Sequence, residues 1–303
     1  MLEAPATVTG VPLRRGLAPA SQRRRRTPAA VLLSACRPRQ WLKNALVALA
    51  PAAAGVLIRP TVLLHVAAAF AVFCLLSSAT YLLNDVRDRK QDRLHPRKRH
   101  RPVASGELHP RGALRLAALM AATGLGLALA VRPLLALVGA SYVALTTSYS
   151  ILLRRVMLAD IALVAAGFVL RTVGGAAAAG VGLSRSFLIV VSGCALFIVA
   201  GKRYAELGAP HPSRAALRHY SRRGLRLVLT GAAAAACAAY AWWALARAPR
   251  MLSLVPFILW LARYRGLLHA GAGEAPEELI LADRGLLVLG LLWALLFTGG
   301  IYA

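Results

Sequence analysis

Long apolar runs alternate with short charged segments along most of the chain. Several runs approach the roughly 20 residues that a helix needs to cross the hydrocarbon core of a bilayer, and the shorter ones suit a helix inside a bundle. Ala and Leu dominate them, without the alternating apolar and polar positions of a membrane β-strand. The pattern predicts an all-α, polytopic membrane protein with nine transmembrane helices, at about residues 44–58, 61–83, 113–131, 133–153, 156–170, 186–201, 225–246, 251–268 and 285–303.

The charge of the chain changes this picture little. Of the 303 residues, 58% are apolar, and 37 Lys and Arg stand against 11 Asp and Glu, which gives a net charge of +26. Such a charge is typical of nucleic-acid-binding proteins, but the chain is more apolar than ordinary soluble domains. We therefore expect membrane lipid as a partner, and no nucleic acid. The cysteines are far apart and form no CxxC pair, so neither a disulfide framework nor a zinc site is expected.

The distribution of basic residues predicts an orientation. With the N-terminus in the cytoplasm, the cytoplasmic segments contain 29 Lys and Arg and the opposite segments contain 6. Cytoplasmic loops of membrane proteins are enriched in these residues, so we expect a multi-pass protein of the cell membrane with its C-terminus outside. Residues 1–35, rich in Ala, Pro and Arg, are expected to form a disordered basic cytoplasmic arm. A single transmembrane domain over residues 36–303 follows.

The segment 84–112 contains the clearest chemical pattern. Asn84, Asp88 and Asp92 recur every fourth residue and would share one face of a helix. Mg²⁺ prefers oxygen ligands and usually bridges carboxylates to substrate phosphates. Asp85 could contact the same ion through water, and bases such as Arg87 supply positive charge for a polyphosphate. The alternative is a solvated loop whose acids merely offset its bases.

At this point the chain resembles a known family. NDVRDRKQD followed by HRPVASGEL is similar to the first aspartate-rich signature of the UbiA family of intramembrane transferases, and the resemblance extends from about Arg37 to the C-terminus. It implies a nine-helix bundle around a central cavity, in agreement with the apolar runs. Most members bind a prenyl diphosphate through two aspartate-rich motifs and Mg²⁺, and they alkylate an aromatic acceptor.

The second motif is expected in the loop after the sixth helix, where this chain reads GKRYAEL. Lys202, Arg203 and Glu206 replace the expected aspartates there, which argues against a second metal site and favours a different phosphorylated donor. Lys202 and Glu206 could also simply pair at i, i+4 on a helix.

Further stretches resemble the branch of the family that transfers phosphoribose. They are RPRQWLKN at 37–44, the turn around residues 149–160, RTVGG from residue 171, and KRYAEL. The resemblance implies transfer of 5-phosphoribose from phosphoribose pyrophosphate to a polyprenyl (decaprenyl) phosphate, with Mg²⁺ as cofactor, for the arabinose donors of arabinogalactan and lipoarabinomannan. Arg154 departs from this branch, where Lys is expected.

The implied site is large. Asp88, Asp92 and Arg87 are the catalytic candidates, and Asn84, Asp88 and Asp92 the metal ligands. The substrate-binding candidates are Lys43, Asn84, Asp85, Tyr149, Arg154, Asp160, Arg171, Lys202, Arg203 and Glu206. For Lys43, Asp160 and Arg171, an interfacial or interhelical structural role is the alternative.

Two other functions remain open at this stage. The first is a UbiA-type aromatic prenyltransferase with a prenyl diphosphate donor, which the altered second motif disfavours. The second is a transporter or membrane scaffold that uses its basic loops to bind anionic lipid; such a protein has no need of three aligned oxygen ligands. The sequence also leaves open whether the chain forms a homo-oligomer.

Overall fold

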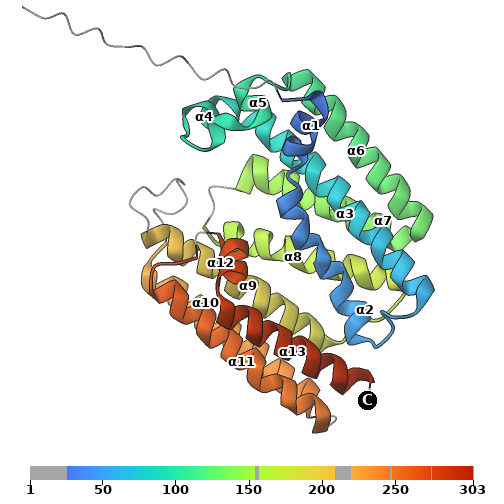
Figure 1. Cartoon of the computed structure of the whole chain (residues 1–303), viewed down its shortest axis with the longest axis vertical. Coiled ribbons are helices and arrows are strands. Elements are labelled where there is room, and N and C mark those ends of the chain that lie inside the picture. The colour runs from blue at the N-terminus through green and yellow to red at the C-terminus, as the bar shows by residue number, and fades with distance from the viewer. Residues whose placement is uncertain (1–25, 154–156, 209–219, 246–247, 274, 303) are drawn as a thin grey trace, which may run out of the picture.

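The computed structural model describes residues 26–153, 157–208, 220–245, 248–273 and 275–302, and every regular element within these ranges is a helix (Figure 1). In chain order the elements are α1 (Pro28–Cys36), the 3₁₀ helix η1 (Pro38–Ala48), α2 (Leu49–Ala53), α3 (Pro60–Arg87), α4 (Arg89–Leu94), η2 (Lys98–His100), α5 (Pro102–Ser105), α6 (Pro110–Val131), α7 (Pro133–Ser148), the π-helical turn η3 (Tyr149–Leu153), α8 (Met157–Ala179), α9 (Arg185–Gly208), α10 (Arg222–Ala244), α11 (Ala248–His269), α12 (Pro276–Ala282) and α13 (Arg284–Tyr302).

Eight helices of the described chain are long and apolar enough to cross a membrane: α3, α6, α7, α8, α9, α10, α11 and α13. The all-α, multi-pass architecture is thus confirmed. The first predicted span differs, because the chain forms η1 and the five-residue α2 there in place of one continuous helix. Gly55, with φ of 69°, follows α2 and turns the chain, in a left-handed conformation that glycine adopts readily.

The first described helix, α1, lies within the segment that was predicted to be disordered. Thr27 caps α1 by accepting a hydrogen bond from the Ala30 N–H, and Pro28 occupies the first helical position. Ala35 is buried in a cluster with Ala79 of α3. The prediction of a disordered arm over residues 1–35 is therefore wrong for its last eight residues, which gain buried apolar contacts; residues 1–25 lie outside the described chain.

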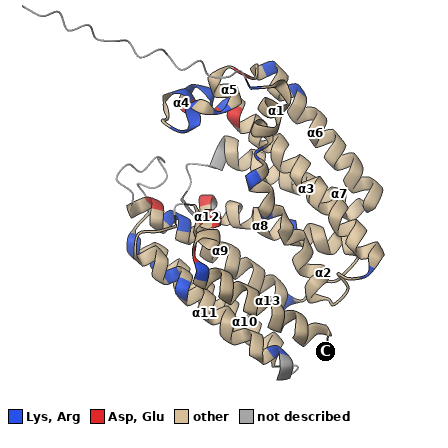
Figure 2. Ribbon diagram, in the orientation of Figure 1, with Lys and Arg blue, Asp and Glu red and all other residues tan. Residues whose placement is uncertain are grey.

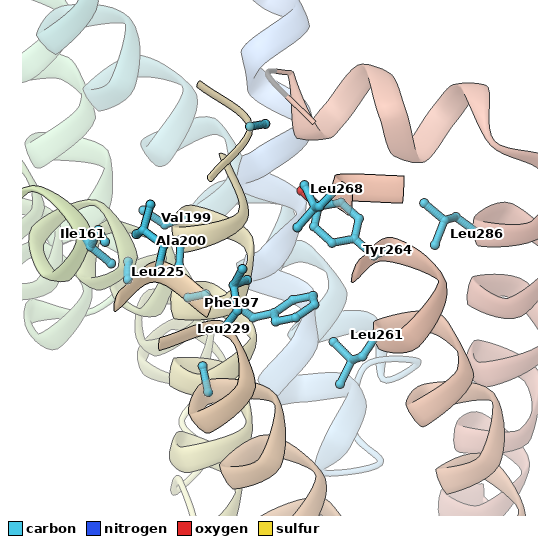
Figure 3. Close-up of a cluster of buried hydrophobic side chains, with 14 residues drawn as sticks. Ile161, Phe197, Val199, Ala200, Leu225, Leu229, Leu261, Tyr264, Leu268 and Leu286 are labelled. Carbon is cyan, nitrogen blue, oxygen red and sulfur yellow. The ribbon is translucent and has the colours of Figure 1, made fainter. Parts of the chain in front are cut away.

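Besides the cluster that contains Ala35 and Ala79, two larger apolar clusters hold the bundle together. One joins η1, α3, α6, α7 and α8 around Phe73, and the other joins α8 to α9, α10, α11 and α13. In the second cluster, Figure 3 shows Phe197 of α9 and Tyr264 of α11 between their helices, with ring centroids 5.6 Å apart. Because α8 contributes to both clusters, it connects the two halves of the bundle.

Two helices extend beyond their apolar runs and carry predicted site residues with them. The fifth predicted helix was expected to end at residue 170, but α8 continues to Ala179, so Arg171 lies inside a helix and is buried. Likewise, α9 continues to Gly208, so the KRYAEL segment is helical and not a loop. In both cases buried polar partners satisfy the charged side chains, and the helix continues through them.

Candidate active site

A cavity of about 670 Å³ lies among η1, α8, α9, α10, α11, α12 and α13. This volume is in the range of ordinary ligand sites. Most of its wall is apolar, including Trp243, Trp293 and Phe297. Its charged lining residues are Lys43, Lys202, Arg203 and Glu277. In Figure 2, charged residues gather where α4, α5 and α12 lie, whereas the long helices are mostly uncharged.

Lys43 connects η1 to α12 at this cavity. Its ammonium Nζ donates to Gln40 Oε1 at 2.6 Å and lies 3.3 Å from Glu277 Oε1. Gln40 Nε2 donates to the same Glu277 oxygen at 3.2 Å. Burial by itself raises the pKa of Glu277, but the charge of Lys43 and hydrogen bonds from backbone and Gln40 outweigh it, so this pKa lies below its ordinary value. Glu277 is therefore a carboxylate at neutral pH.

Arg203 is the centre of a buried ionic network. Its side chain is 2% exposed, Nε and Nη2 donate to the two carboxylate oxygens of Asp160 at 2.5 and 3.0 Å, and Nη1 donates to Glu206 at 2.9 Å. The Tyr149 hydroxyl also donates to Asp160. Tyr149 belongs to η3, and π-helical turns of this kind are frequent at functional sites. The observed partner of Glu206 is thus Arg203, at i, i+3.

Arg171 forms a second buried network, with neutral acceptors. It donates to Asn44 Oδ1 at 2.7 Å, to the Gly167 carbonyl at 2.6 Å and to the Tyr142 hydroxyl at 2.8 Å. Its guanidinium also lies over the Tyr142 ring, 4.7 Å from the centroid. Asp160 and Arg171 share α8 but bind different neighbours, so each joins α8 to other helices.

The aspartate-rich segment lies at the end of α3. The Asp88 N–H donates to the Asn84 carbonyl at 2.8 Å and the Asp92 N–H to the Asp88 carbonyl at 2.9 Å, although the three residues do not lie on one continuous helix, because α3 ends at Arg87 and α4 begins at Arg89. Asp88 stands between α3 and α4, and Asp92 is buried. Arg87 is exposed at the last position of α3.

Two arginines bind the acids of this segment. Arg37 donates to Asp85, and Arg101 Nη1 bridges Asp85 and Asp92, at 3.2 and 2.8 Å. Arg37 has φ of 55°, a conformation uncommon for residues other than glycine and found often at functional sites. Asp85 Oδ2 is buried without a hydrogen-bond partner.

Whether Mg²⁺ fits this segment depends on its donors. In the described residues, no three His, Cys, Asp or Glu side chains come together closely enough to hold a metal ion. Mg²⁺, however, is usually held by one or two carboxylates together with waters and substrate phosphates. The donors here are oxygens, and one of them, Asp85 Oδ2, is buried and unpartnered. The segment therefore fits an ion that a phosphorylated substrate helps to bind.

The structure brings Lys43, Tyr149, Lys202 and Arg203 together at the cavity, with Asp160 and Glu206 behind Arg203. Asp85 and Asp92 form a second group, and Arg37, which donates to Asp85, lies over the ring of Tyr81 on α3, 5.0 Å from its centroid. Arg154 lies outside the described residues. Sequence reasoning missed Glu277, although a Glu after a proline in a chain with only 11 acids was an available signal.

Fold and site together define a class of protein, the multi-pass intramembrane transferases. The chain belongs to the UbiA prenyltransferase family, whose family model matches residues 44–289. A solved structure of a UbiA homologue from Archaeoglobus fulgidus bound to GPP and Mg²⁺ has the same fold, with a TM-score of 0.68 at 19% identity, over 90% of this chain and 99% of that one.

Within the family, the chain is similar to proteins named decaprenyl-phosphate phosphoribosyltransferase. The protein of that name from Corynebacterium glutamicum is 38% identical over 89% of this chain and 86% of its own length. The one from Mycobacterium tuberculosis is 39% identical over 86% of this chain and 91% of its own length.

Proposed function

We propose that the protein transfers 5-phosphoribose from phosphoribose pyrophosphate to a polyprenyl phosphate, releasing pyrophosphate. The observation that carries this proposal is the wall of the cavity, where the ammonium-bearing Lys43 and Lys202 stand beside a largely apolar surface. Two phosphorylated substrates, one of them a lipid, match that combination. The relatives named decaprenyl-phosphate phosphoribosyltransferase support the same assignment, and with it a role in making lipid-linked arabinose donors for the cell wall.

The apolar wall suits the lipid substrate. Its tail would lie among the cavity helices, against side chains such as Phe168, Val190 and Ile198, because apolar surface removed from water or headgroups stabilises binding. Lys202, on the same wall, would hold its phosphate. Arg203 pairs with both Asp160 and Glu206, which weakens the repulsion between these acids and the phosphate.

The reaction replaces one bond at the ribose anomeric carbon by another. An oxygen of the lipid phosphate attacks that carbon, while the bond to the pyrophosphate oxygen breaks and its electron pair leaves with pyrophosphate. Attack opposite the leaving group implies inversion. The lipid phosphate is already ionised near neutral pH, so no strong general base is needed. Arg87, on the exposed end of α3, would stabilise the negative charge that develops on pyrophosphate.

Asn84, Asp88 and Asp92 would hold Mg²⁺ together with the donor's pyrophosphate, and Asp85, whose Oδ2 is buried without a hydrogen-bond partner, would contact the ion through water. When bound, the ion would neutralise charge on the leaving group. In the structure Arg101 lies between Asp85 and Asp92, so positive charge already stabilises these carboxylates before a metal arrives.

We place the protein in the cell membrane with the aspartate-rich segment on the cytoplasmic side, since cytoplasmic segments contain most of the Lys and Arg. A phosphoribosyl donor made in the cytosol then has direct access to the site.

The metal assignment is tested with Asp88→Ala in membranes supplied with labelled phosphoribose pyrophosphate and polyprenyl phosphate. Wild-type membranes should form a lipid-linked product that a chelator abolishes, and Asp88→Ala membranes should form none while containing a normal amount of the protein. Glu278→Ala, which changes an exposed acid outside the aspartate-rich signature, is the control and should keep activity. Retained activity in Asp88→Ala would contradict the metal assignment.

A further inference from the structure

Glu277 is an acid with no role in the transfer described above, and it lines the cavity. Among the described residues of the cavity wall it is the only one with a carboxylate, and it stands with the cations Lys43, Lys202 and Arg203. It occupies the first turn of α12, next to the buried Pro276 that begins this helix. The position is thus built into the fold and is not a chance orientation of a surface loop.

The environment of Glu277 keeps its carboxylate charged and accessible. Lys43 and Gln40 both contact the same oxygen, Oε1. The side chain remains 24% exposed, in contrast to Asp160, which is 1% exposed and enclosed by Arg203. A molecule that enters the cavity can therefore reach Glu277, but not Asp160.

A carboxylate beside two phosphorylated substrates has a narrow range of useful roles. It repels phosphate oxygens, and it cannot bind an isoprenoid tail. It does accept hydrogen bonds from hydroxyl groups, and acidic side chains recognise ribose hydroxyls in this way in dinucleotide sites. Of the two proposed substrates, only the donor has a pair of sugar hydroxyls. Lys43, 3.3 Å from the carboxylate, can bind a phosphate of the same molecule.

We propose that Glu277 accepts hydrogen bonds from the 2- and 3-hydroxyls of the phosphoribosyl donor and thereby selects a sugar donor over a prenyl diphosphate, which has no such hydroxyl. This inference rests on the proposed function and adds a specificity residue to it. Glu277 could instead serve only to hold α12 against η1 through Lys43. That role would affect every donor equally, whereas hydroxyl recognition affects only donors that have the hydroxyls.

The experiment compares wild type, Glu277→Gln and the matched control Glu278→Gln, which removes an exposed carboxylate from the adjacent position of the same helix. Each purified protein is reconstituted with polyprenyl phosphate. It is assayed with phosphoribose pyrophosphate and with its 2-deoxy and 3-deoxy analogues. Wild type and Glu278→Gln should prefer the natural donor over at least one analogue by about 10- to 100-fold in kcat/KM, the value of a hydrogen bond to a charged group.

In Glu277→Gln, whose amide oxygen accepts only a neutral hydrogen bond, this preference should fall by about three- to tenfold, because kcat/KM drops for the natural donor and little for the analogue. An equal drop for all donors, or an unchanged preference, overturns the inference and leaves the proposed function intact. Absence of transfer from any sugar donor by wild type overturns the proposed function itself. If Glu277→Gln is not recovered as folded protein, Glu277→Asp, which keeps the charge but shortens the reach, must show a reduced preference.

Discussion

Arg203 binds two acids from a position that is almost fully buried. Its guanidinium donates to both oxygens of Asp160, 43 residues earlier in the chain, and to Glu206 on its own helix. Charges removed from water are costly unless they are paired and hydrogen-bonded, and here both ends of the pair are satisfied. The network therefore joins α8 to α9 beside the cavity and fixes the lysine at residue 202 next to it.

Removing the arginine should expose that cost. Arg203→Met leaves Asp160 as a buried charge without its cation and should destabilise the protein by about 3–5 kcal/mol. Thermal unfolding in detergent measures the loss. Arg265→Met, an exposed position on α11, should change little. The double variant Asp160→Asn/Arg203→Met should recover part of this loss. A loss of stability in the double variant equal to the sum of the losses in the two single variants would contradict this account of the pair.

Among the elements, η1 depends on one glycine of α8. A Cβ placed on Gly175 would lie 1.8 Å from the Val47 carbonyl oxygen, so the two backbones touch directly. This contact holds η1, which with α2 replaces the first predicted span, against α8 in the middle of the bundle. It also orients Lys43 and Asn44, one turn earlier, toward the cavity and toward Arg171.

Gly175→Ala should therefore push η1 away from α8. We expect a destabilisation of about 1–3 kcal/mol or more, the usual cost of overpacking. The opposing atoms belong to the backbone and cannot rotate away. Gly231→Ala, in α10, is the matched control: its Cβ would meet nothing within 4 Å, and alanine favours a helix over glycine. Equal melting temperatures for the two variants in detergent would contradict the close contact.

The contact between Glu277 of α12 and Lys43 of η1 should depend on pH. Because the pKa of Glu277 is lower in the folded protein than its ordinary value, ionised Glu277 stabilises the fold above that ordinary value and loses this effect as pH falls through the folded one. Wild type should be more stable than Glu277→Gln at pH 7, and the difference should shrink below about pH 4.3. Unfolding curves of both proteins across pH 3–7 measure this; a difference that grows toward low pH would contradict it.

How far the sequence predicts these elements depends on what ends each one. The apolar runs locate α3, α6, α7, α10, α11 and α13 well, because burial in a membrane requires continuous apolar residues. They fail at α8 and α9, where Arg171 and Arg203 continue a helix because partners from distant segments satisfy them. They fail again at η1, whose position depends on Gly175, 128 residues after Val47. The motif residues could be named from sequence; Glu277 could be noticed there as a rare acid, but its contact with Lys43 could not be predicted, since only the fold brings the two together.

For the molecule as a whole, the charges imply a direction across the membrane. Lys90 on α4 should face the cytoplasm and Arg59, before α3, the opposite side; both are exposed. In a background with the four native cysteines replaced by Ala, Lys90→Cys should react with a membrane-impermeant maleimide only in inside-out vesicles. Arg59→Cys should react only in intact cells. The reverse pattern would contradict the orientation. It would place the aspartate-rich segment on the side of the membrane opposite to the cytosolic donor.

The most direct test of the central claim offers both kinds of donor to one preparation. Purified protein in vesicles with polyprenyl phosphate and a phenolic acid is given equal amounts of phosphoribose pyrophosphate and a prenyl diphosphate, each with its own label, and Mg²⁺. We predict that the sugar label enters the lipid fraction as phosphoribosyl polyprenyl phosphate and that the prenyl label does not reach the aromatic ring. Prenylation of the phenolic acid without any sugar-linked lipid would contradict the account.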